Sequence, residues 1–226
     1  MDWTHHCAAV IPCFNEAPHI EAVIAEVRRY LPCIMVVDDG STDGTGRKAV
    51  AAGAEVIRQE RNGGKGCALR AGWRHARQLG FTWALMMDGD GQHGPGDIPK
   101  FFASAGTTGA TLVVGNRMGN AAAMPWLRRQ VNRWMSRRLS MLSGARLPDS
   151  QCGFRLAHLG TLAALPLAGR RFEIESETLL AFLAAGQAVE FVPIEVIYES
   201  NRSKISPLID TWRWFRWWTA QSAFSQ

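Results

Sequence analysis

The amino-acid sequence predicts an α/β domain with a mostly parallel central sheet flanked by helices. Short apolar runs of strand length alternate with segments whose apolar residues recur at helical spacing, and short turns join them. Carboxylates directly follow two of these runs, at the position where open α/β sheets bind their ligands. The chain has 226 residues, of which 47% are hydrophobic, and this suffices for one domain with a substantial core.

The first half of the chain alternates regularly between the two kinds of element. The predicted strands are Cys7–Ile11, Ile34–Val37, Glu55–Arg58, Trp83–Met87 and Thr111–Val114, and the first run stops at Pro12. The predicted helices are one through Ile20, Val23, Ile24, Val27 and Leu31, a short one from about Ser41–Asp43 to Ala52, and one from the glycine-rich loop Asn62–Gly66 to about Leu79.

The second half is less regular. Its expected elements are a helix from Pro125 to about Ser143, an extended segment over Asp149–Leu156, a helix from near Glu175, a strand over Ala188–Tyr198 broken at Pro193, and an aromatic tail over Leu208–Trp218. The first of these helices is assigned the apolar positions Leu127, Val131, Trp134 or Met135, and Leu142. The same helix carries the cations Arg128, Arg129, Arg133, Arg137 and Arg138.

Charge and cysteine content limit the partners and the compartment. A net charge of +5 and a pI near 9.2 indicate an anionic partner, such as a phosphorylated small molecule, a lipid surface or a nucleic acid. No recognised nucleic-acid motif is present, so no nucleic-acid partner is expected. Five scattered cysteines without a Cys-x-x-Cys pair indicate reduced thiols in a cytoplasmic setting, and we find neither a secretory signal nor a membrane-spanning run.

Asp88 and Asp90 form the most informative motif. They follow the apolar run Trp83–Met87, one residue apart, on a turn loosened by glycines. Carboxylates of this kind suit Mg²⁺ or Mn²⁺, which proteins hold through one or two carboxylates together with substrate phosphates. Gln92 is a candidate for a third oxygen ligand. The alternative interpretation is a polar turn that caps the next helix.

Four polar segments of the first half are expected to meet at one edge of the sheet. They are Asn15–Glu16, Asp38–Asp39, Gly63–Gly66 and the Asp88/Asp90 pair. A carboxylate after the second strand suits a ribose or a base, and the glycine-loop amides with Lys65 suit phosphate oxygens at a helix start. The alternative for Lys65 is a solvated loop lysine. Neither a Walker loop nor a Gly-x-Gly-x-x-Gly after the first strand is present, which disfavours a Rossmann dinucleotide site.

Five motifs, in this order, resemble those of the family 2 inverting glycosyltransferases. They are Val10-Ile-Pro-Cys-Phe-Asn-Glu16, Val36-Val-Asp-Asp-Gly-Ser-Thr-Asp-Gly44, Asn62-x-Gly-Lys-Gly66, Met87-Asp-Gly-Asp-Gly-Gln-His93 and Asp149-Ser-Gln-Cys-Gly-Phe-Arg155. The chain is similar in particular to the polyprenyl-phosphate sugar synthases, such as dolichol-phosphate mannose synthase, over about residues 7–205. The resemblance implies a GT-A domain over 1–205, with a nucleotide-sugar half (7–118), an acceptor half (119–205) and a separate C-terminal segment (206–226).

The resemblance also implies roles for individual residues. It places nucleotide binding at Pro12, Phe14, Asn15, Glu16, Asp38, Asp39 and Asp88. It places the metal and diphosphate site at Asp88, Asp90 and Gln92, phosphate contacts at Arg117, Ser203 and Lys204, and acceptor-side contacts at Gln151 and Arg155. It also matches Glu175 with an acid that the family shares. Independently, Arg129 and Arg133 are one helical turn apart and are expected to point together at a phosphate.

These roles suit the metal-dependent transfer of a sugar from a nucleotide-diphosphate donor. The leaving group builds negative charge, which a cation at Asp90 would stabilise together with Arg117 and Lys204. A lipid-phosphate acceptor is already anionic and needs no strong base. A hydroxyl acceptor needs a carboxylate, for which Glu175 or Glu177 is the candidate. The alternative role of both glutamates is to complement a helix dipole.

Two departures from the family pattern keep other activities open. Polyprenyl-phosphate members usually carry an arginine six residues before Lys204, where this chain has Tyr198, and Arg202 is a neighbouring substitute. No transmembrane pair follows, which is also true of some members of the branch. A transferase that acts on a hydroxyl acceptor is the nearest alternative, and a non-catalytic basic binding module is a remote one.

The C-terminal tail combines aromatic and basic side chains, namely Trp212, Arg213, Trp214, Phe215, Arg216, Trp217 and Trp218. Tryptophan at headgroup level and arginine against anionic lipid suit an interfacial anchor. The alternative is packing against the domain or against the partner of a homodimer. The arginine-rich helix also has two interpretations. Its cations either contact a membrane and a pyrophosphate, or they form a solvated face. We therefore expect a cytoplasmic enzyme, peripheral on the inner face of the plasma membrane.

Overall fold

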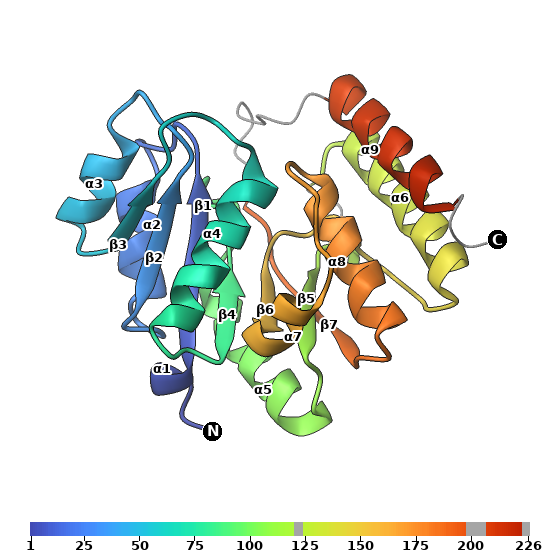
Figure 1. Ribbon diagram of the computed structural model, residues 1–226, viewed down its shortest axis with the longest axis horizontal. Coiled ribbons are helices and arrows are strands. Elements are labelled where there is room, and N and C mark those ends of the chain that lie inside the picture. The colour runs from blue at the N-terminus through green and yellow to red at the C-terminus, as the bar shows by residue number, and fades with distance from the viewer. Residues whose placement is uncertain (120–123, 198–206, 223–226) are drawn as a thin grey trace.

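The computed structural model describes residues 1–119, 124–197 and 207–222. In this part of the chain, one sheet has the strand order β3-β2-β1-β4-β6-β5-β7 (Figure 1). The strands are β1 (Cys7–Cys13), β2 (Ile34–Asp38), β3 (Glu55–Arg58), β4 (Trp83–Met86), β5 (Leu112–Asn116), β6 (Arg155–His158) and β7 (Val189–Pro193). The helices are α1 (Trp3–His6), α2 (Ile20–Val27), α3 (Thr45–Ala51), α4 (Lys65–Gln78), α5 (Ile98–Thr108), α6 (Trp126–Ser143), α7 (Leu159–Ala164), α8 (Glu173–Ala184) and α9 (Pro207–Ser222).

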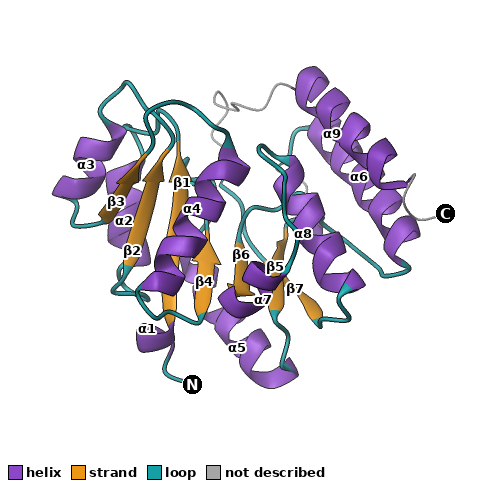
Figure 2. Ribbon diagram, in the orientation of Figure 1, coloured by secondary structure: helices purple, strands orange, loops and turns teal. Residues whose placement is uncertain are grey.

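The prediction of a mostly parallel α/β sheet is confirmed. Among the described strands, only β6 runs antiparallel to its neighbours, β4 and β5. Strands β2 and β4 are buried along their whole length, and β1 along nearly all of it, which explains their continuous apolar sequences. Helices α2 and α4 cover opposite faces of the sheet (Figure 2), because the β1–β2 and β3–β4 crossovers run in opposite directions. Ligands of such sheets bind where the strand order reverses, at the carboxyl ends of β1 and β4.

The apolar face predicted for α2 is correct, whereas that of α6 is partly wrong. The α2 positions Ile20, Val23, Ile24 and Val27 are all buried. In α6, Leu127 is 52% exposed, and the buried positions are Asn132, Met135, Ser136 and Leu139. The inner face of α6 is therefore partly polar, because it packs on hydrogen-bonding groups that lie next to a cavity.

Other differences from the sequence prediction have local causes. Strand β1 continues through Pro12 to Cys13, because β4 pairs with β1 only as far as Val10 and the missing proline N–H removes no bond on that side. Helices α5 and α7 were not predicted, since their small and polar residues give a weak periodic signal. The antiparallel direction of β6 follows from tertiary packing and has no signature in its four residues.

Helices α6 and α9 lie side by side at the edge of the molecule away from β3 (Figure 1). Helix α9 also contacts α8, which follows the acceptor-side motif in the chain. None of the helices in the described ranges combines the length and the hydropathy that a membrane span requires.

Candidate active site

A cavity of about 680 Å³ opens at the carboxyl ends of β1 and β4. From the first half of the chain it is lined by Pro12, Phe14, Asn15, Glu16, His19, Asp39, Asn62, Lys65, Asp88, Asp90, Gln92 and His93, among others. From the second half it is lined chiefly by Arg117, Met124, Arg128, Val131, Asn132, Met135, Gln151, Arg171, Phe172, Glu175, Arg213 and Trp214. The polar segments that the sequence placed at one sheet edge therefore do face a common cavity.

Lys65 joins the two halves of the cavity through a double ion pair. Its Nζ lies 2.5 Å from Asp88 Oδ1 and 2.7 Å from Glu175 Oε1. Burial alone would lower the pKa of Lys65, but the two carboxylates outweigh it and raise this pKa above its usual value. Gly153 permits the arrangement, because a Cβ at that position would lie 2.6 Å from the same Nζ. The alternative of a solvated loop lysine is thus wrong.

Asp88 is held ionised by its neighbours. Burial would raise the pKa of this carboxyl, but Lys65 and the ring of His93, whose Nε2 lies 3.4 Å from Asp88 Oδ2, bring it well below its usual value. Nδ1 of His93 is buried and has no hydrogen-bond partner among the described residues. Oε2 of Glu175 is also buried and also has no hydrogen-bond partner among the described residues. Each of these atoms requires a partner that a ligand in the cavity can supply.

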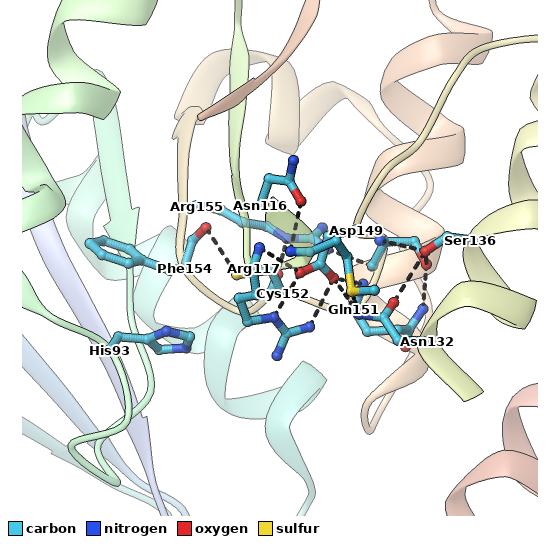
Figure 3. A network of polar contacts seen from close by, with 12 residues as sticks. His93, Asn116, Arg117, Asn132, Ser136, Asp149, Gln151, Cys152, Phe154 and Arg155 are labelled. Carbon is cyan, nitrogen blue, oxygen red and sulfur yellow. Dashed lines mark hydrogen bonds and ion pairs between the residues drawn. The ribbon is translucent and has the colours of Figure 1, made fainter. Parts of the chain in front are cut away.

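Arg117 is oriented by a buried carboxylate, Asp149 (Figure 3). Asp149 accepts hydrogen bonds from Nε and Nη2 of Arg117, at 2.7 and 2.8 Å, and from the Arg117 backbone N–H. It also accepts from Asn132 Nδ2 and from the backbone of Gln151. Burial would raise the pKa of Asp149, but the Arg117 guanidinium holds it below its usual value. This bidentate pair fixes the plane of Arg117 at the cavity wall.

The amides of the three loop glycines already donate within the protein and are not free to bind a phosphate, so that prediction is wrong. The N–H groups of Gly63 and Gly64 both donate to the carboxylate of Asp39, at 2.8 Å. Gly66 N–H donates to the carbonyl of Arg170, and a Cβ on Gly66 would lie 2.2 Å from the carbonyl oxygen of Gly169. The start of α4 is therefore capped by Asp39 and by the 169–170 backbone, which the glycines allow to approach.

Three predicted contact residues instead hold the scaffold. Asp38 is fully buried, accepts from Arg58 and from Ser41 N–H, and does not line the cavity, so the expected contact with a base or ribose is wrong. Arg155 is buried and donates to the carbonyls of Ser150, Cys152 and Glu175, not to an acceptor. Glu177 accepts from the N–H groups of Ala168 and Gly169 and lies outside the cavity lining, which removes it as a candidate base.

The predicted arginine pair of α6 does not share the cavity. Arg128, Asn132 and Met135 line it, at the spacing of one helical face, whereas Arg133 is exposed and Arg129 does not line it. The expectation that Arg129 and Arg133 meet one phosphate there is therefore wrong, because both lie about 100° further around the helix. Ser203 and Lys204, with Tyr198 and Arg202, lie outside the described residues.

Comparison with known proteins identifies the family. A family model described as "Glycosyl transferase family 2" matches residues 8–177. The chain belongs to glycosyl transferase family 2. It is therefore an enzyme of the glycosyltransferase class, as its five sequence motifs implied.

Two relatives of this glycosyltransferase are named as polyprenyl-phosphate sugar transferases. Undecaprenyl-phosphate mannosyltransferase of Micrococcus luteus is 30% identical over 213 residues, which cover 87% of this chain and 86% of that protein. UDP-N-acetylglucosamine–dolichyl-phosphate N-acetylglucosaminyltransferase of Methanococcus voltae is 30% identical over 217 residues, with 84% of each chain covered. The resemblance to that branch is thus confirmed.

A solved structure confirms the fold of this glycosyltransferase. Glucosyl-3-phosphoglycerate synthase of Mycobacterium tuberculosis, in complex with UDP, superposes with a TM-score of 0.77 at 24% identity, covering 95% of this chain and 79% of that one. The same protein has also been crystallised with Mn²⁺, UDP and glucosyl-3-phosphoglycerate. The likeness shows that the family 2 domain described here has the GT-A fold.

The sequence prediction did not assign roles to several residues that line the site. His93 follows Gln92 directly in the recognised motif, so its position was a usable signal. Arg128 could have been found from helical periodicity, because it lies two turns before Met135 and therefore on the same face of the helix. Trp214 had no distinguishing signal, because four tryptophans of the tail lie within seven residues of each other.

Proposed function

We propose that this glycosyltransferase moves a sugar, with inversion, from a nucleotide-diphosphate sugar to a polyprenyl phosphate or another lipid acceptor. In this proposal residues 7–118 bind the donor, residues 119–205 bind the acceptor, and 206–226 form a separate C-terminal segment. The names of the relatives from Micrococcus luteus and Methanococcus voltae support the class of acceptor. Nucleotide contacts are proposed for Pro12, Phe14, Asn15, Glu16, Asp39 and Asp88, all of which line the cavity.

The composition of the acceptor side is the observation that carries the proposal. Arginines from three separate segments line the cavity there, namely Arg128, Arg171 and Arg213, and Arg117 lines it at the end of the donor half. Apolar side chains lie among them, namely Met124, Val131, Met135, Val196, Ile197 and Trp214. A cationic wall with apolar surroundings matches the two parts of a lipid phosphate, an anionic head and a hydrocarbon chain.

The residues of the chain divide the work of transfer. Arg117, held flat by Asp149, is placed to stabilise charge that develops on phosphate oxygens during bond cleavage. An acceptor phosphate is anionic before it attacks, so this reaction requires no general base. Lys65 pairs with both Asp88 and Glu175, and its charge reduces their repulsion of each other and of an anionic donor. Lys204 and Ser203 remain proposed phosphate contacts from the family motif.

The donor set of the Asp-Gly-Asp-Gly-Gln turn fits a divalent cation. Among the described residues, no cluster of three His, Cys, Asp or Glu side chains could hold a metal by itself. The cavity does present Asp88, Asp90 and Gln92, which are oxygen donors of the type that Mg²⁺ and Mn²⁺ use together with substrate phosphates. We propose these three residues as the protein ligands. The ion would neutralise charge on the departing diphosphate.

The buried, unpartnered Oε2 of Glu175 favours a second candidate function, transfer to a hydroxyl acceptor with Glu175 as the base. A carboxylate oxygen without a donor is suited to receive a proton from an alcohol. The other oxygen of the same carboxylate, Oε1, pairs with Lys65. Running the transfer assay with a polyprenol in place of its phosphate separates this function from the first.

The first prediction concerns donor and metal binding. We expect one of a panel of UDP-, GDP-, dTDP- and CMP-sugars to stabilise the protein in the presence of Mn²⁺, by about 2.7 kcal/mol at a hundredfold excess over its Kd. Asp90→Ala is expected to lose the part of this stabilisation that depends on Mn²⁺, because Asp90 lines the cavity at the proposed ion site. Thermal unfolding with and without Mn²⁺ measures both effects.

Asp2→Ala is the control for this test, since Asp2 is exposed at the N-terminus and lies outside the cavity lining. It should retain the full shift. Stabilisation by no nucleotide sugar would contradict the proposed function, and an undiminished Mn²⁺ effect in Asp90→Ala would contradict the metal site.

We further propose that the α6–α9 face, defined as the exposed side chains of these two helices, contacts the cytoplasmic surface of the plasma membrane. Its exposed apolar members are Trp126, Leu127, Met141, Trp212 and Phe215, and its exposed cations are Arg133, Arg137, Arg138, Arg213 and Arg216. Aromatic and cationic side chains on one surface suit an interface of anionic lipid.

The second prediction tests this face. Trp212→Ala with Phe215→Ala is expected to weaken binding to vesicles that contain phosphatidylglycerol by about tenfold, because apolar area of two aromatic side chains is lost. Co-sedimentation measures the binding. Leu79→Ala is the control, since Leu79 is also half exposed but follows α4, away from this face. Equal binding of all variants would contradict the proposal, and a concentration-dependent dimer in sedimentation velocity would assign the face to a second copy instead.

A further inference from the structure

Trp214 differs from the other tryptophans of α9 in its surroundings. It is 3% exposed, lines the cavity, and packs edge-on against Trp134 of α6 with ring centroids 5.4 Å apart. Its indole Nε1 donates to the hydroxyl of Ser176 at 2.8 Å. Nε1 of Trp217, on the same helix, is buried without a partner in the described part of the chain. Helix α9 is thus tied to the domain by a directed bond at Trp214.

Ser176 connects this bond to the acceptor-side motif. Its hydroxyl oxygen is fully buried in α8 and accepts from Trp214 Nε1 and from Gln151 Nε2, both at 2.8 Å. A hydroxyl oxygen has two acceptor positions, and these two donors occupy both. The orientation of the Gln151 amide is therefore linked to the presence of the indole.

The hydrogen bonds of Gln151 fix which end of its amide faces the cavity. Its Nε2 donates to Ser150 as well as to Ser176, so both amide protons are used within the protein. Its carbonyl oxygen receives no hydrogen bond from any described residue, although Gln151 lines the cavity. The oxygen left over is an acceptor, and it suits a donor group such as a hydroxyl.

We propose that Trp214 is a positioning residue of the transfer site, which holds Gln151 so that its carbonyl oxygen accepts a hydrogen bond from a substrate hydroxyl. The inference rests on the proposed function, because a transferred sugar and an alcohol acceptor are the two sources of such a hydroxyl. Helix α9 is then part of the binding site as well as of the α6–α9 face. Arg213, the neighbour of Trp214, lines the same cavity.

Trp214→Phe tests the proposal, because it keeps an aromatic six-membered ring and removes the indole N–H together with the five-membered ring, a loss of ring area that Trp217→Phe reproduces. We expect the affinity for the nucleotide sugar that stabilises the wild type to fall about threefold to tenfold, the effect of one hydrogen bond, while the affinity for the matching nucleoside diphosphate stays unchanged. Calorimetry on the full chain gives both constants. A raised KM for the acceptor with unchanged donor affinity would place the hydroxyl on the acceptor instead, and would also support the proposal.

Two further variants separate positioning from a general loss of structure. Trp217→Phe makes the same substitution on the same helix without removing a hydrogen bond, and should behave as wild type. Ser176→Ala should reproduce or exceed the effect of Trp214→Phe, and the double variant should be no worse than Ser176→Ala, because both changes act through one bond.

Three outcomes would overturn the proposal. The first is that Trp214→Phe has the same binding constants and KM values as Trp217→Phe. The second is that its effect adds to that of Ser176→Ala in the double variant. The third is that it lowers the affinities for the nucleotide sugar and for the nucleoside diphosphate equally. If Trp214→Phe does not fold, Ser176→Ala alone decides by the same comparison of constants. Failure of the wild type to bind any nucleotide sugar would instead overturn the proposed function.

Discussion

Lys65→Met is expected to lower the free energy of unfolding by about 3–5 kcal/mol, the cost of leaving a buried charge without its partner. Nζ of Lys65 pairs with both Asp88 and Glu175, and its side chain is only 13% exposed. Methionine has nearly the same length and no charge, so the variant leaves two carboxylates facing each other at a cavity. Urea unfolding followed by fluorescence measures the loss.

The same variant should bind a nucleotide-diphosphate donor at least about tenfold more weakly, since the two uncompensated carboxylates repel the diphosphate at short range. Lys48→Met is the matched control. Lys48 pairs with Glu21 at 3.0 Å, but both side chains are about half exposed, and such a pair contributes at most about 1 kcal/mol. If the two variants were equally stable, the double ion pair would not be a structural element of the site.

The framework of the site was predictable because it depends on local sequence. The runs that form β1, β2 and β4 are apolar throughout, and each ends at the residues that face the cavity. A parallel arrangement then places those ends at one edge of the sheet, whatever the details of packing. This is why Asp39, Asp88 and Asp90 were assigned to one cavity from sequence alone.

The partners of each polar group were not predictable, because they are set by residues far away in the chain. Asp38 and Asp39 are adjacent, yet one is bonded to Arg58 and the other caps the glycine loop. Two glycines of that loop, Gly64 and Gly66, allow the close approach of the backbone of residues 169–170, about a hundred positions later in the chain. Motif spacing carries no information about which groups of the protein bond to each of two neighbouring carboxylates, or about which of the two also lines the cavity.

Asp149→Asn is expected to reduce the transfer rate about a hundredfold and stability by about 3–5 kcal/mol. The carboxylate forms the bidentate pair with Arg117 and also accepts from Asn132, whereas an amide nitrogen would face these donors with its own hydrogens. Arg117 would then lose its fixed plane and its counter-charge together. Transfer to undecaprenyl phosphate, assayed with the donor found in the binding panel, measures the first effect.

The pH dependence of stability provides the second readout for Asp149→Asn. Because the folded-state pKa of Asp149 is lowered, wild type gains stability from this group above the unfolded value of about 3.9, and loses that gain as the pH falls below it toward the folded pKa. The stability difference between wild type and Asp149→Asn should therefore be widest near pH 7 and narrow in acid.

Asp43 provides the control variant. Its pKa is also lowered, and it accepts hydrogen bonds from the N–H groups of Thr45 and Ala17 at the start of α3, outside the cavity. Asp43→Asn keeps a capping oxygen there and should transfer sugar at the wild-type rate, so a loss common to both variants would contradict a specific role for the Asp149–Arg117 pair.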